Sequence, residues 1–398
     1  MTYDFTIVGA GIVGLASALH IKNNFPESKV AVIEKENSIA KHQTGNNSGV
    51  IHSGIYYKPG SLKAINCKKG YDLMLTFLQE YDLPYELCGK IILATKVSEL
   101  PALENIFNRG IENGLENLKY LDTKELKEVE PYAEGIKAIH VPQAGITDYK
   151  LVAKKYQELL ENKGVNFFFG QKVIGLENQN RVVKLKTQKE NFITRKVINC
   201  GGLFSDKLAR LTLDRLEYKI VPFRGEYYDL QPSAQHLVKG LIYPVPDPNF
   251  PFLGVHFTKT IHGGVESGPN AVFAFSREGY SKTKINIPEL FESLTYSGFL
   301  SIAKKHWKTG SMEMYRSFSK TSYVRSLQKL IPSITGKDVV RGGAGVRAQA
   351  VKKDGSMVDD FLILQSENII NVCNAPSPAA TASLAIGEHI ATLVSKNF

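Results

Sequence analysis

Residues 4–34 read DFTIVGAGIVGLASALHIKNNFPESKVAVIE, and this stretch decides the fold. The pattern predicts a buried strand from Asp4 to Val8, an amphipathic helix from Ile12 to Asn23 and a second strand from Lys29 to Glu34. A strand, a glycine-rich turn, a helix and a further strand in this order make a βαβ unit. The unit indicates an α/β fold that begins with a Rossmann-like domain.

The turn between the first strand and the helix has three glycines at the spacing of a dinucleotide-binding fingerprint. Gly9 allows the tight turn, Gly11 lets the backbone approach a pyrophosphate, and Gly14 lets the helix pack closely on the strand. The first N–H groups of the helix, at Ile12 and Val13, add a partial positive charge. The motif therefore predicts a nucleotide cofactor held at this turn.

An acidic residue ends the second strand of this unit. Glu34 lies twenty positions after Gly14, where its carboxylate can accept hydrogen bonds from ribose hydroxyls, and Lys35 beside it is a further candidate. The fingerprint alone does not distinguish NAD from FAD. The next segment, His42 to Gly54, is rich in glycine and amide side chains and has low helix propensity. Such a loop can present backbone donors to a flat polar ring, which favours a flavin.

Two later blocks make the chain resemble the D-amino-acid-oxidase-like superfamily of FAD enzymes. They are a strand followed by two glycines, Val197 to Gly202, and a C-terminal turn, Asn374 to Thr381. The helix after this turn would direct its N-terminus at the flavin. Besides the fingerprint, the resemblance implies FAD contacts at Thr44, Asn46, Ser48, Gly49, Val173, Cys200, Gly201, Gly202, Ser377, Ala379, Ala380 and Thr381.

Within that superfamily the chain resembles the L-2-hydroxyglutarate dehydrogenase/oxidase family. The similarity covers nearly the whole chain and is carried by NSGVIHSGIYYKPGSLKA (47–64), VPFRGEYYDL (221–230), GGAGVRAQAVKKDG (342–355) and NAPSPAATASLAIGEHIA (374–391). The resemblance implies FAD-dependent oxidation of L-2-hydroxyglutarate to 2-oxoglutarate, with oxygen or a membrane quinone taking the electrons. The alternatives are a related flavin enzyme of an amino acid or glycerol 3-phosphate, or a non-catalytic flavoprotein subunit. The sequence departs from the family at His262, because an acidic residue is expected near this position.

A dicarboxylate substrate requires cations at both ends. Arginine suits carboxylates because its planar guanidinium binds them in a bidentate way. Arg347 in GAGVRAQ and Arg224 in PFRGEYY are the candidates, although either could instead tie loops together through backbone carbonyls. Tyr57 and Tyr227 could add hydroxyl groups, but tyrosines in an aromatic-rich sheet more often serve packing.

Oxidation of a 2-hydroxy acid also requires a base for the hydroxyl proton, while the hydride goes to flavin N5. His256, in FLGVHFT, is the preferred base because imidazole titrates near neutrality. Without the resemblance, a histidine among apolar neighbours would be read as a core residue. His52 lies in the segment from His42 to Gly54, the flavin-side loop. It has three possible roles: a second acid/base or substrate donor, a covalent flavin attachment point, or a structural anchor.

Composition narrows the class of protein. The 398 residues are 43% hydrophobic and 22% charged, which is ordinary for a globular protein. No signal peptide, no apolar run long enough to span a bilayer and no metal-ligand spacing among the four cysteines is evident. These features favour a reduced cytoplasmic protein without a metal.

The formal net charge is +10, and residues 301–350 alone hold ten Lys/Arg against two Asp/Glu. Basic residues interleaved with Trp307 and Tyr315 suit the inner face of an anionic membrane, to which the chain would bind peripherally. A solvated helix face is the alternative. Nucleic acid is not expected because no nucleic-acid-binding motif accompanies the charge.

The remaining pattern predicts two interleaved domains: an FAD-binding domain of residues 1–80, 145–210 and 335–398, and an α+β substrate domain of residues 81–144 and 211–334. Helices are expected at 63–81, 148–163, 287–306, 321–330 and 378–394. Strands are expected at 165–169, 170–177, 181–187, 192–199 and 369–373, and an antiparallel sheet at 221–275.

Overall fold

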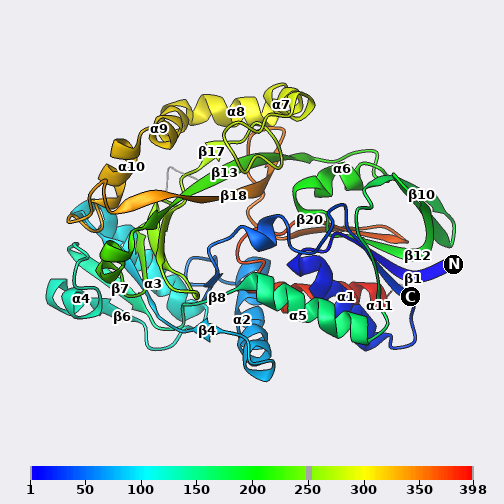
Figure 1. The fold of residues 1–398 in the computed structure, drawn as a ribbon, viewed down its shortest axis with the longest axis horizontal. Helices are drawn as coiled ribbons and strands as arrows, with labels where there is room; N and C mark the ends of the chain where they lie inside the picture. Colours follow the sequence, from blue (N-terminus) through cyan, green and yellow to red (C-terminus); the bar gives the residue numbers. More distant parts are fainter. Residues whose placement is uncertain (1, 248–252, 397–398) are drawn as a thin grey trace.

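The computed structural model describes residues 2–247 and 253–396, and its strands form two large sheets that lie side by side (Figure 1). Residues 248–252, part of the expected sheet region 221–275, lie outside the described residues. In Figure 1 both termini lie in the half that contains β1, β12 and β20.

The first sheet is the cofactor sheet. Its order is β10-β11-β12-β1-β2-β9, with β20 also beside β12 and β19 beside β20. Parallel pairing of β1 with β2 and with β12 confirms the predicted βαβ unit. Its strands are β1 Thr2–Val8, β2 Val30–Ile33, β9 Asn166–Phe168, β10 Val173–Gln179, β11 Val182–Thr187, β12 Asn191–Asn199, β19 Leu362–Gln365 and β20 Ile369–Asn374.

Four helices cover one face of the cofactor sheet. They are α1 Ile12–Asn24, α2 Leu62–Glu80, α5 Tyr149–Asn162 and α11 Ser383–Ser395. α1 packs against both α5 and α11, and all four helices contribute to the largest hydrophobic core. Because α11 comes from the end of the chain, this core joins distant parts of the sequence.

The second sheet is largely antiparallel, with the order β17-β13-β16-β15-β14-β5-β7-β6 and with β18 beside β13. One of its faces packs on α4 and α10, where Leu126, Tyr323 and Leu327 are buried. Its strands are β5 Lys90–Ala94, β6 Lys119–Leu121, β7 Lys137–Val141, β13 Tyr218–Leu230, β14 Leu241–Pro244, β15 His256–Lys259, β16 Val265–Gly268, β17 Val272–Phe273 and β18 Val339–Lys352.

Shorter elements complete the described chain. A small sheet contains β3 Val50–Ile51, β8 Gly145–Thr147 and β4 Tyr85–Glu86. The other helices are α3 Leu100–Glu112, α4 Thr123–Val129, α6 Ser205–Ala209, α7 Ile287–Leu294, α8 Ser297–Lys305, α9 Trp307–Phe318 and α10 Lys320–Leu327. The 3₁₀ turns are η1 Gln43–Gly45, η2 Val97–Glu99, η3 Gly202–Phe204 and η4 Pro232–Leu237.

Three expectations differ from the structure. The helix expected over 287–306 is interrupted at Thr295 and Tyr296, because the Tyr296 hydroxyl donates to the Val351 carbonyl and draws the chain toward β18. The last helix begins at Ser383 rather than at Pro378, since the residues before it form turns. β18 lies in the second sheet, whereas the expected boundary placed all of 335–398 with the cofactor domain.

Candidate active site

The glycine-rich turn has the close packing that the fingerprint requires. A Cβ atom on Gly14 would lie 2.0 Å from the Gly9 carbonyl oxygen, and one on Gly9, whose φ is +108°, would lie 2.5 Å from the Cys200 carbonyl oxygen. A Cβ on Gly11 would meet only the Thr44 hydroxyl, at 3.4 Å. The turn is therefore closed on its inner side and open above Gly11, as a bound pyrophosphate requires.

Side chains from neighbouring segments hold the glycine-rich turn, which forms the cofactor cradle, in place. The Thr44 hydroxyl accepts a hydrogen bond of 3.0 Å from the Ile12 N–H. The Glu34 carboxylate accepts from the N–H groups of Ala10 and Glu36, at 2.8 and 2.9 Å. Each Glu34 oxygen keeps acceptor capacity for a ribose hydroxyl. Together the open turn, the helix N-terminus and this carboxylate fit the pyrophosphate and ribose of FAD.

The loop after Glu34 is held by its own amides. Asn46 donates to the carbonyls of Lys41 and His42, and the Gly49 N–H donates to the Asn47 side chain. The structure gives no side-chain hydrogen bond for Ser48 in the described chain. Asn46 thus shapes the loop with its side chain, and its backbone carbonyl oxygen lies close to β18, where a Cβ on Gly345 would be 2.6 Å from it.

The C-terminal turn is attached to the same loop. The Thr381 hydroxyl accepts from the His52 N–H at 3.1 Å and lies 2.7 Å from the Tyr149 hydroxyl. The Ser377 hydroxyl lies 3.2 Å from His52 Nε2. Ala379 and Ala380 lie between these two anchors. The structure therefore brings the flavin-side loop and the C-terminal turn together, as the sequence predicts.

The other predicted cofactor residues lie around the first sheet. Cys200, Gly201 and Gly202 follow β12 directly, and Cys200 contacts the fingerprint turn. The Gly201 N–H is held by the Asn199 side chain at 3.0 Å. Val173 opens β10 and packs on the hydrophobic core on the other side of this sheet. These residues remain predicted FAD contacts.

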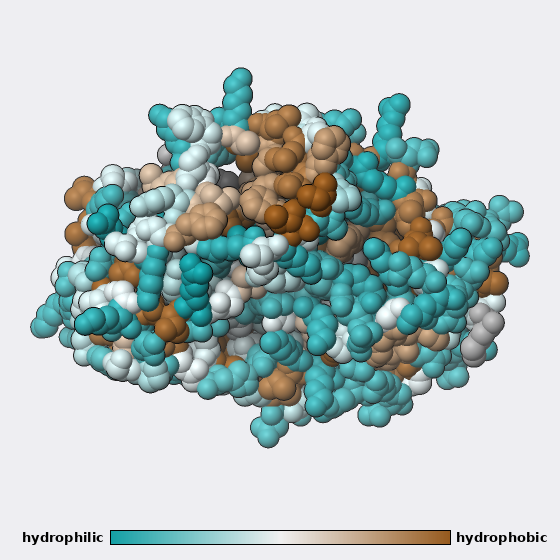
Figure 2. Space-filling model, turned by 45° about the horizontal axis from the view of Figure 1, so that its top comes forward, coloured by the Kyte–Doolittle hydropathy of each residue, from teal (hydrophilic) through white to brown (hydrophobic). Residues whose placement is uncertain are grey.

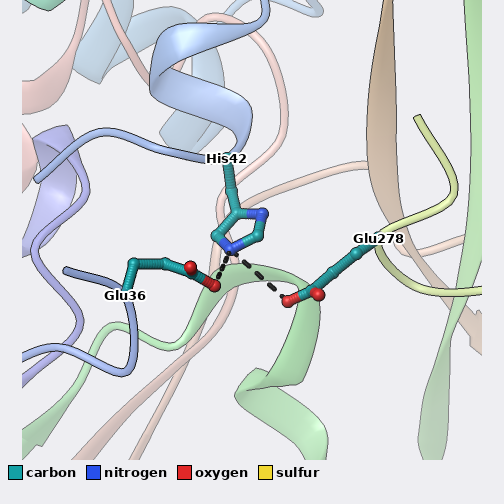
Figure 3. Close-up of side chains that lie close together, drawn as sticks. All are labelled: Glu36, His42 and Glu278. Carbon is teal, nitrogen blue, oxygen red and sulfur yellow. Dashed lines mark hydrogen bonds and ion pairs between the residues drawn. The ribbon is translucent and has the colours of Figure 1, made fainter. Parts of the chain in front are cut away.

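Lys35 does not present a free ammonium group. It forms ion pairs with Glu36 and Glu278. His42 Nε2 lies 2.9 Å from Glu36 and 3.4 Å from Glu278, between the two carboxylates (Figure 3). Burial alone would lower the pKa of Lys35, but the two carboxylates outweigh burial and raise it. Although Glu36, His42 and Glu278 have the spacing of metal ligands, two lysines, Lys35 and Lys284, already balance the charge of the two carboxylates. The cluster joins the cofactor half to the 276–281 segment.

The substrate-side residues lie on one face of the second sheet. Lys90 is paired with Leu241 on β14, and Leu241 is paired with Thr258 on β15. Because residues two apart on a strand point to the same face, Tyr243 and His256 share the face of Lys90. The rings of Tyr243 and His256 stack with centroids 3.9 Å apart. The Lys90 ammonium lies 4.2 Å from the centre of the Tyr243 ring.

His256 is held as a neutral imidazole. Its Nδ1 lies 2.8 Å from the Gly254 carbonyl oxygen, so Nδ1 carries the proton and donates to it, and Nε2 is left as an acceptor. Burial, together with the charges of Lys90 and Arg347, lowers the pKa of His256 to about 3. Such a group can accept a proton once negative charge is bound nearby.

Arg347 lies on β18 opposite Phe223 and shares the site face with Tyr227. Its charge interacts with Tyr227 and Tyr243, so the structure brings Arg347 together with His256 and Tyr227. Burial raises the pKa of Tyr227 to about 12, and Arg347 acts in the opposite direction. Tyr227 therefore remains a neutral hydroxyl beside a cation.

His52 belongs to the same group of residues. Burial, with a smaller contribution from charge repulsion by Lys90 and His256, lowers the pKa of His52 to about 3. Tyr57 lies close to Ser377, the hydroxyl of which also contacts His52. His52 thus connects the flavin-side loop, to which it belongs, with the cationic face.

Arg224 is placed differently from the substrate-binding role expected of it. It is buried, and its guanidinium is 3.0 Å from the Glu226 carboxylate through both Nε and Nη2. Nη1 donates to the Ser281 carbonyl at 3.2 Å. Adjacent strand residues point to opposite faces, so Arg224 faces away from Phe223 and Arg347. The structure supports the alternative reading, in which Arg224 ties loops together.

Sequence reasoning missed Lys90 and Tyr243. Lys90 starts the apolar run KIILA, and a lysine at a strand end usually points to solvent, yet it is only 2% exposed. Its position between two aromatic residues distant in sequence left no local signal. His262, whose role was open, is exposed, and its Nε2 lies 2.7 Å from the Asp148 carboxylate.

A family model described as FAD dependent oxidoreductase (DAO) matches residues 4–393. The chain is 53% identical to L-2-hydroxyglutarate dehydrogenase of Indibacter alkaliphilus, with 100% of both chains covered. It is 42% identical to the human mitochondrial L-2-hydroxyglutarate dehydrogenase, over 100% of this chain and 89% of that one.

Solved structures show the same fold. The dithionite-reduced L-α-glycerophosphate oxidase of Mycoplasma pneumoniae, with FAD bound, superposes with a TM-score of 0.81. It is 22% identical, and the match covers 99% of this chain and 95% of that chain. With the family model, the full-length relatives and the cradle in agreement, the chain belongs to the DAO family of FAD-dependent oxidoreductases and, within it, to the L-2-hydroxyglutarate dehydrogenases.

Proposed function

We propose that this protein oxidises L-2-hydroxyglutarate to 2-oxoglutarate with FAD as its cofactor. The observation that carries the proposal is a sheet face on which two cations, the buried Lys90 and the partly exposed Arg347, both act on a neutral, buried histidine, His256. A dicarboxylate with a hydroxyl near one end matches this arrangement of charge. The relatives named L-2-hydroxyglutarate dehydrogenase, similar over the full chain, support the same substrate.

In the proposed reaction His256 receives the hydroxyl proton at Nε2. Bound FAD supplies the hydride acceptor, flavin N5. The Gly254 carbonyl fixes the tautomer of His256 and the Tyr243 ring fixes the plane of its imidazole. The carboxylates of the substrate raise the pKa of His256 when they bind, because they offset the two nearby cations. The base therefore gains strength only with the substrate in place.

The other residues of the face hold the substrate. Arg347 is proposed to bind one carboxylate through its guanidinium fork, with the Tyr227 hydroxyl beside it. His52 and Tyr57, near Ser377, are proposed to donate hydrogen bonds on the flavin side. Buried polar groups around the substrate also exclude bulk water, which strengthens each of these interactions.

Anaerobic mixing tests the proposal directly. The FAD-loaded protein is mixed with L- and D-2-hydroxyglutarate, L-lactate, L-malate, an L-amino acid and glycerol 3-phosphate, and flavin absorbance is followed. L-2-Hydroxyglutarate should bleach the flavin fastest. Faster bleaching by an amino acid or glycerol 3-phosphate would assign the site to the related enzymes, and retention of oxidised flavin with every substrate would indicate a non-catalytic flavoprotein.

For reoxidation, we propose a membrane quinone, reached by peripheral binding to an anionic membrane, with oxygen as the competing acceptor. The surface that supports this lies on α7–α9, along one edge of the molecule, where Figure 2 shows apolar side chains gathered. No helix in the described ranges is long and apolar enough to cross a bilayer. The exposed apolar residues of this surface are Ile285, Ile287, Phe291, Leu294, Leu300, Trp307, Met312, Tyr315 and Phe318.

The charges around this surface fit anionic lipid. Lys304, Lys305 and Lys308 are exposed on or next to its helices. The acidic residues of the same helices are engaged elsewhere. Glu313 is buried and paired with Arg316, Glu292 pairs with lysines of other segments, and Glu289 accepts a hydrogen bond from the Arg277 N–H. An apolar strip flanked by exposed basic groups is typical of a membrane-surface helix.

Trp307 provides the measurement, since it is the single tryptophan of the chain and is 61% exposed. Vesicles containing phosphatidylglycerol should shift its emission to shorter wavelength and sediment the protein, and salt should weaken both effects. Replacing Phe291 and Leu294 by Ser should reduce sedimentation, whereas Val97→Ser, on an exposed site elsewhere, should not. An unchanged emission spectrum together with protein left in the supernatant would refute membrane binding.

A further inference from the structure

Lys90 is a buried cation without an anionic partner in the described chain. It begins β5, and its side chain is almost completely shielded from solvent. Its ammonium lies over the rings of Tyr243 and Tyr56, 4.2 and 5.4 Å from their centres. The groups that act on its charge are the thiols of Cys67 and Cys88, and no described carboxylate is paired with it.

Tyr56 adds a second unsatisfied group to the same place. Its hydroxyl oxygen is buried, and no hydrogen-bond partner for it is present among the described residues. A buried hydroxyl without a partner costs free energy, as does a buried ammonium without a counter-charge. One ligand atom that carries negative charge and accepts hydrogen bonds would satisfy both groups.

Sheet order places this pair opposite Arg347. From β18 to β5 the order is β18, β13, β16, β15, β14 and β5, so His256 on β15 lies between Arg347 and Lys90. The two cations therefore approach the proposed base from opposite sides. One carboxylate cannot neutralise both, whereas the two ends of a dicarboxylate can.

We propose that Lys90 and Tyr56 form a second carboxylate subsite, which makes the enzyme selective for dicarboxylic substrates. The ammonium supplies the charge, and the Tyr56 hydroxyl donates a hydrogen bond to the same carboxylate. Arg347 binds the other carboxylate. This inference rests on the proposed function for the identity of the substrate, but the subsite itself concerns only the binding of a second carboxylate.

Binding of unreactive acids tests the subsite without catalysis. Glutarate, with two carboxylates, and butyrate, with one, are titrated into the FAD-loaded protein by calorimetry. The wild-type protein should bind glutarate about 100-fold more tightly than butyrate, as expected for one buried charged hydrogen-bonded pair. Lys90→Met should abolish most of this difference, and Tyr56→Phe should reduce it by about 5-fold to 10-fold.

Lys137→Met is the matched control. Lys137, on β7 of the same sheet, also lies over a tyrosine ring, 3.9 Å from the centre of Tyr120, but does so outside the site. This variant should keep the full preference for glutarate. Flavin content and the unfolding temperature of each variant show whether it is folded, and Tyr56→Phe, which removes one oxygen atom, provides the test if Lys90→Met does not fold.

The outcomes separate the two proposals. If Lys90→Met or Tyr56→Phe keeps the wild-type preference for glutarate over butyrate, the subsite is refuted. If the preference depends on Lys90 but L-2-hydroxyglutarate does not reduce the flavin, the subsite is supported and the proposed function fails. Loss of the preference together with a large rise in KM for L-2-hydroxyglutarate supports both.

Discussion

The cofactor half and the substrate half of the molecule build their sites from different parts of the chain. In the cofactor half, backbone groups at strand ends and the N-terminus of α1 form the cradle, and side chains such as Thr44 and Glu34 brace it. In the substrate half, side chains on one sheet face form the site. A substitution in the backbone site should disturb FAD binding and folding together. A substitution in the side-chain site should remove only the role of the residue that is replaced.

The largest expected effect is on the backbone site. Gly14→Val would place a side chain 2.0 Å from the Gly9 carbonyl, which would force α1 away from β1. We expect loss of bound FAD and a markedly lower unfolding temperature, measured by the flavin-to-protein ratio and by thermal denaturation.

Gly310→Ala is the control for that change. Gly310 lies on α9 with no atom within 4 Å of the added Cβ, and alanine favours helix by about 1 kcal/mol over glycine. This variant should keep FAD and full stability. Retention of FAD by Gly14→Val would show that the cradle is less constrained than its backbone contacts indicate.

The next effect belongs to the proposed base. His256→Asn should slow flavin reduction by L-2-hydroxyglutarate by about 10²-fold to 10⁴-fold, the usual contribution of general base catalysis. FAD should stay bound, because the residue lies on the substrate face. Stopped-flow measurement under anaerobic conditions gives the rate, and His52→Asn measured alongside ranks the two histidines. A normal rate in His256→Asn would exclude it as the base.

The two arginines sharpen the comparison. Arg224→Gln removes the closer ion-pair partner of the buried Glu226 carboxylate and leaves only Lys282, at 3.5 Å, so it should destabilise the protein by about 3 kcal/mol, the lower end of the cost of breaking a buried pair. Arg347→Gln should instead raise KM for L-2-hydroxyglutarate by about 10-fold to 100-fold, as expected when one charged pair to substrate is lost. Denaturant unfolding and steady-state kinetics distinguish them. A raised KM with normal stability in Arg224→Gln would return this residue to the substrate site.

The smallest effect is a dependence on pH. Burial lowers the pKa of Lys90 to about 8, so in the free enzyme its charge is present below pH 8 and is lost as the pH rises through this value. The value of kcat/KM should therefore fall above pH 8, and this alkaline limb of the pH profile should be absent in Lys90→Met. Because the pKa of His256 is lowered to about 3, no acidic limb from this residue is expected between pH 5 and 7. A limb that persists in Lys90→Met would belong to another group.

The cofactor half could be predicted because its signals are local. The spacing of Gly9, Gly11 and Gly14 and the distance to Glu34 specify a βαβ unit within about thirty residues, as the motif does in general. The breaks at Thr295 and before Ser383 could not be read in this way. They depend on contacts with β18 and with the flavin-side loop, which are distant in sequence.

The substrate half was predictable only in part. The resemblance and simple chemistry identified His256, Arg347 and Tyr227, which the structure brings together. They did not separate Arg347 from Arg224, because the two side chains differ in the face of the sheet that they occupy, and strand register fixes that face. Lys90 was missed for the same reason.

The order of the chain has a consequence for biosynthesis. α1, near the N-terminus, packs on α11 at the opposite end, and β12 is flanked by β1 and by β20. A ribosome-bound nascent chain therefore carries the glycine turn long before the partners that bury its helix have been made. Capture of FAD is expected to await release of the C-terminal segment, so that chains lacking residues 369–396 would be recognised by chaperones and proteases as unfinished.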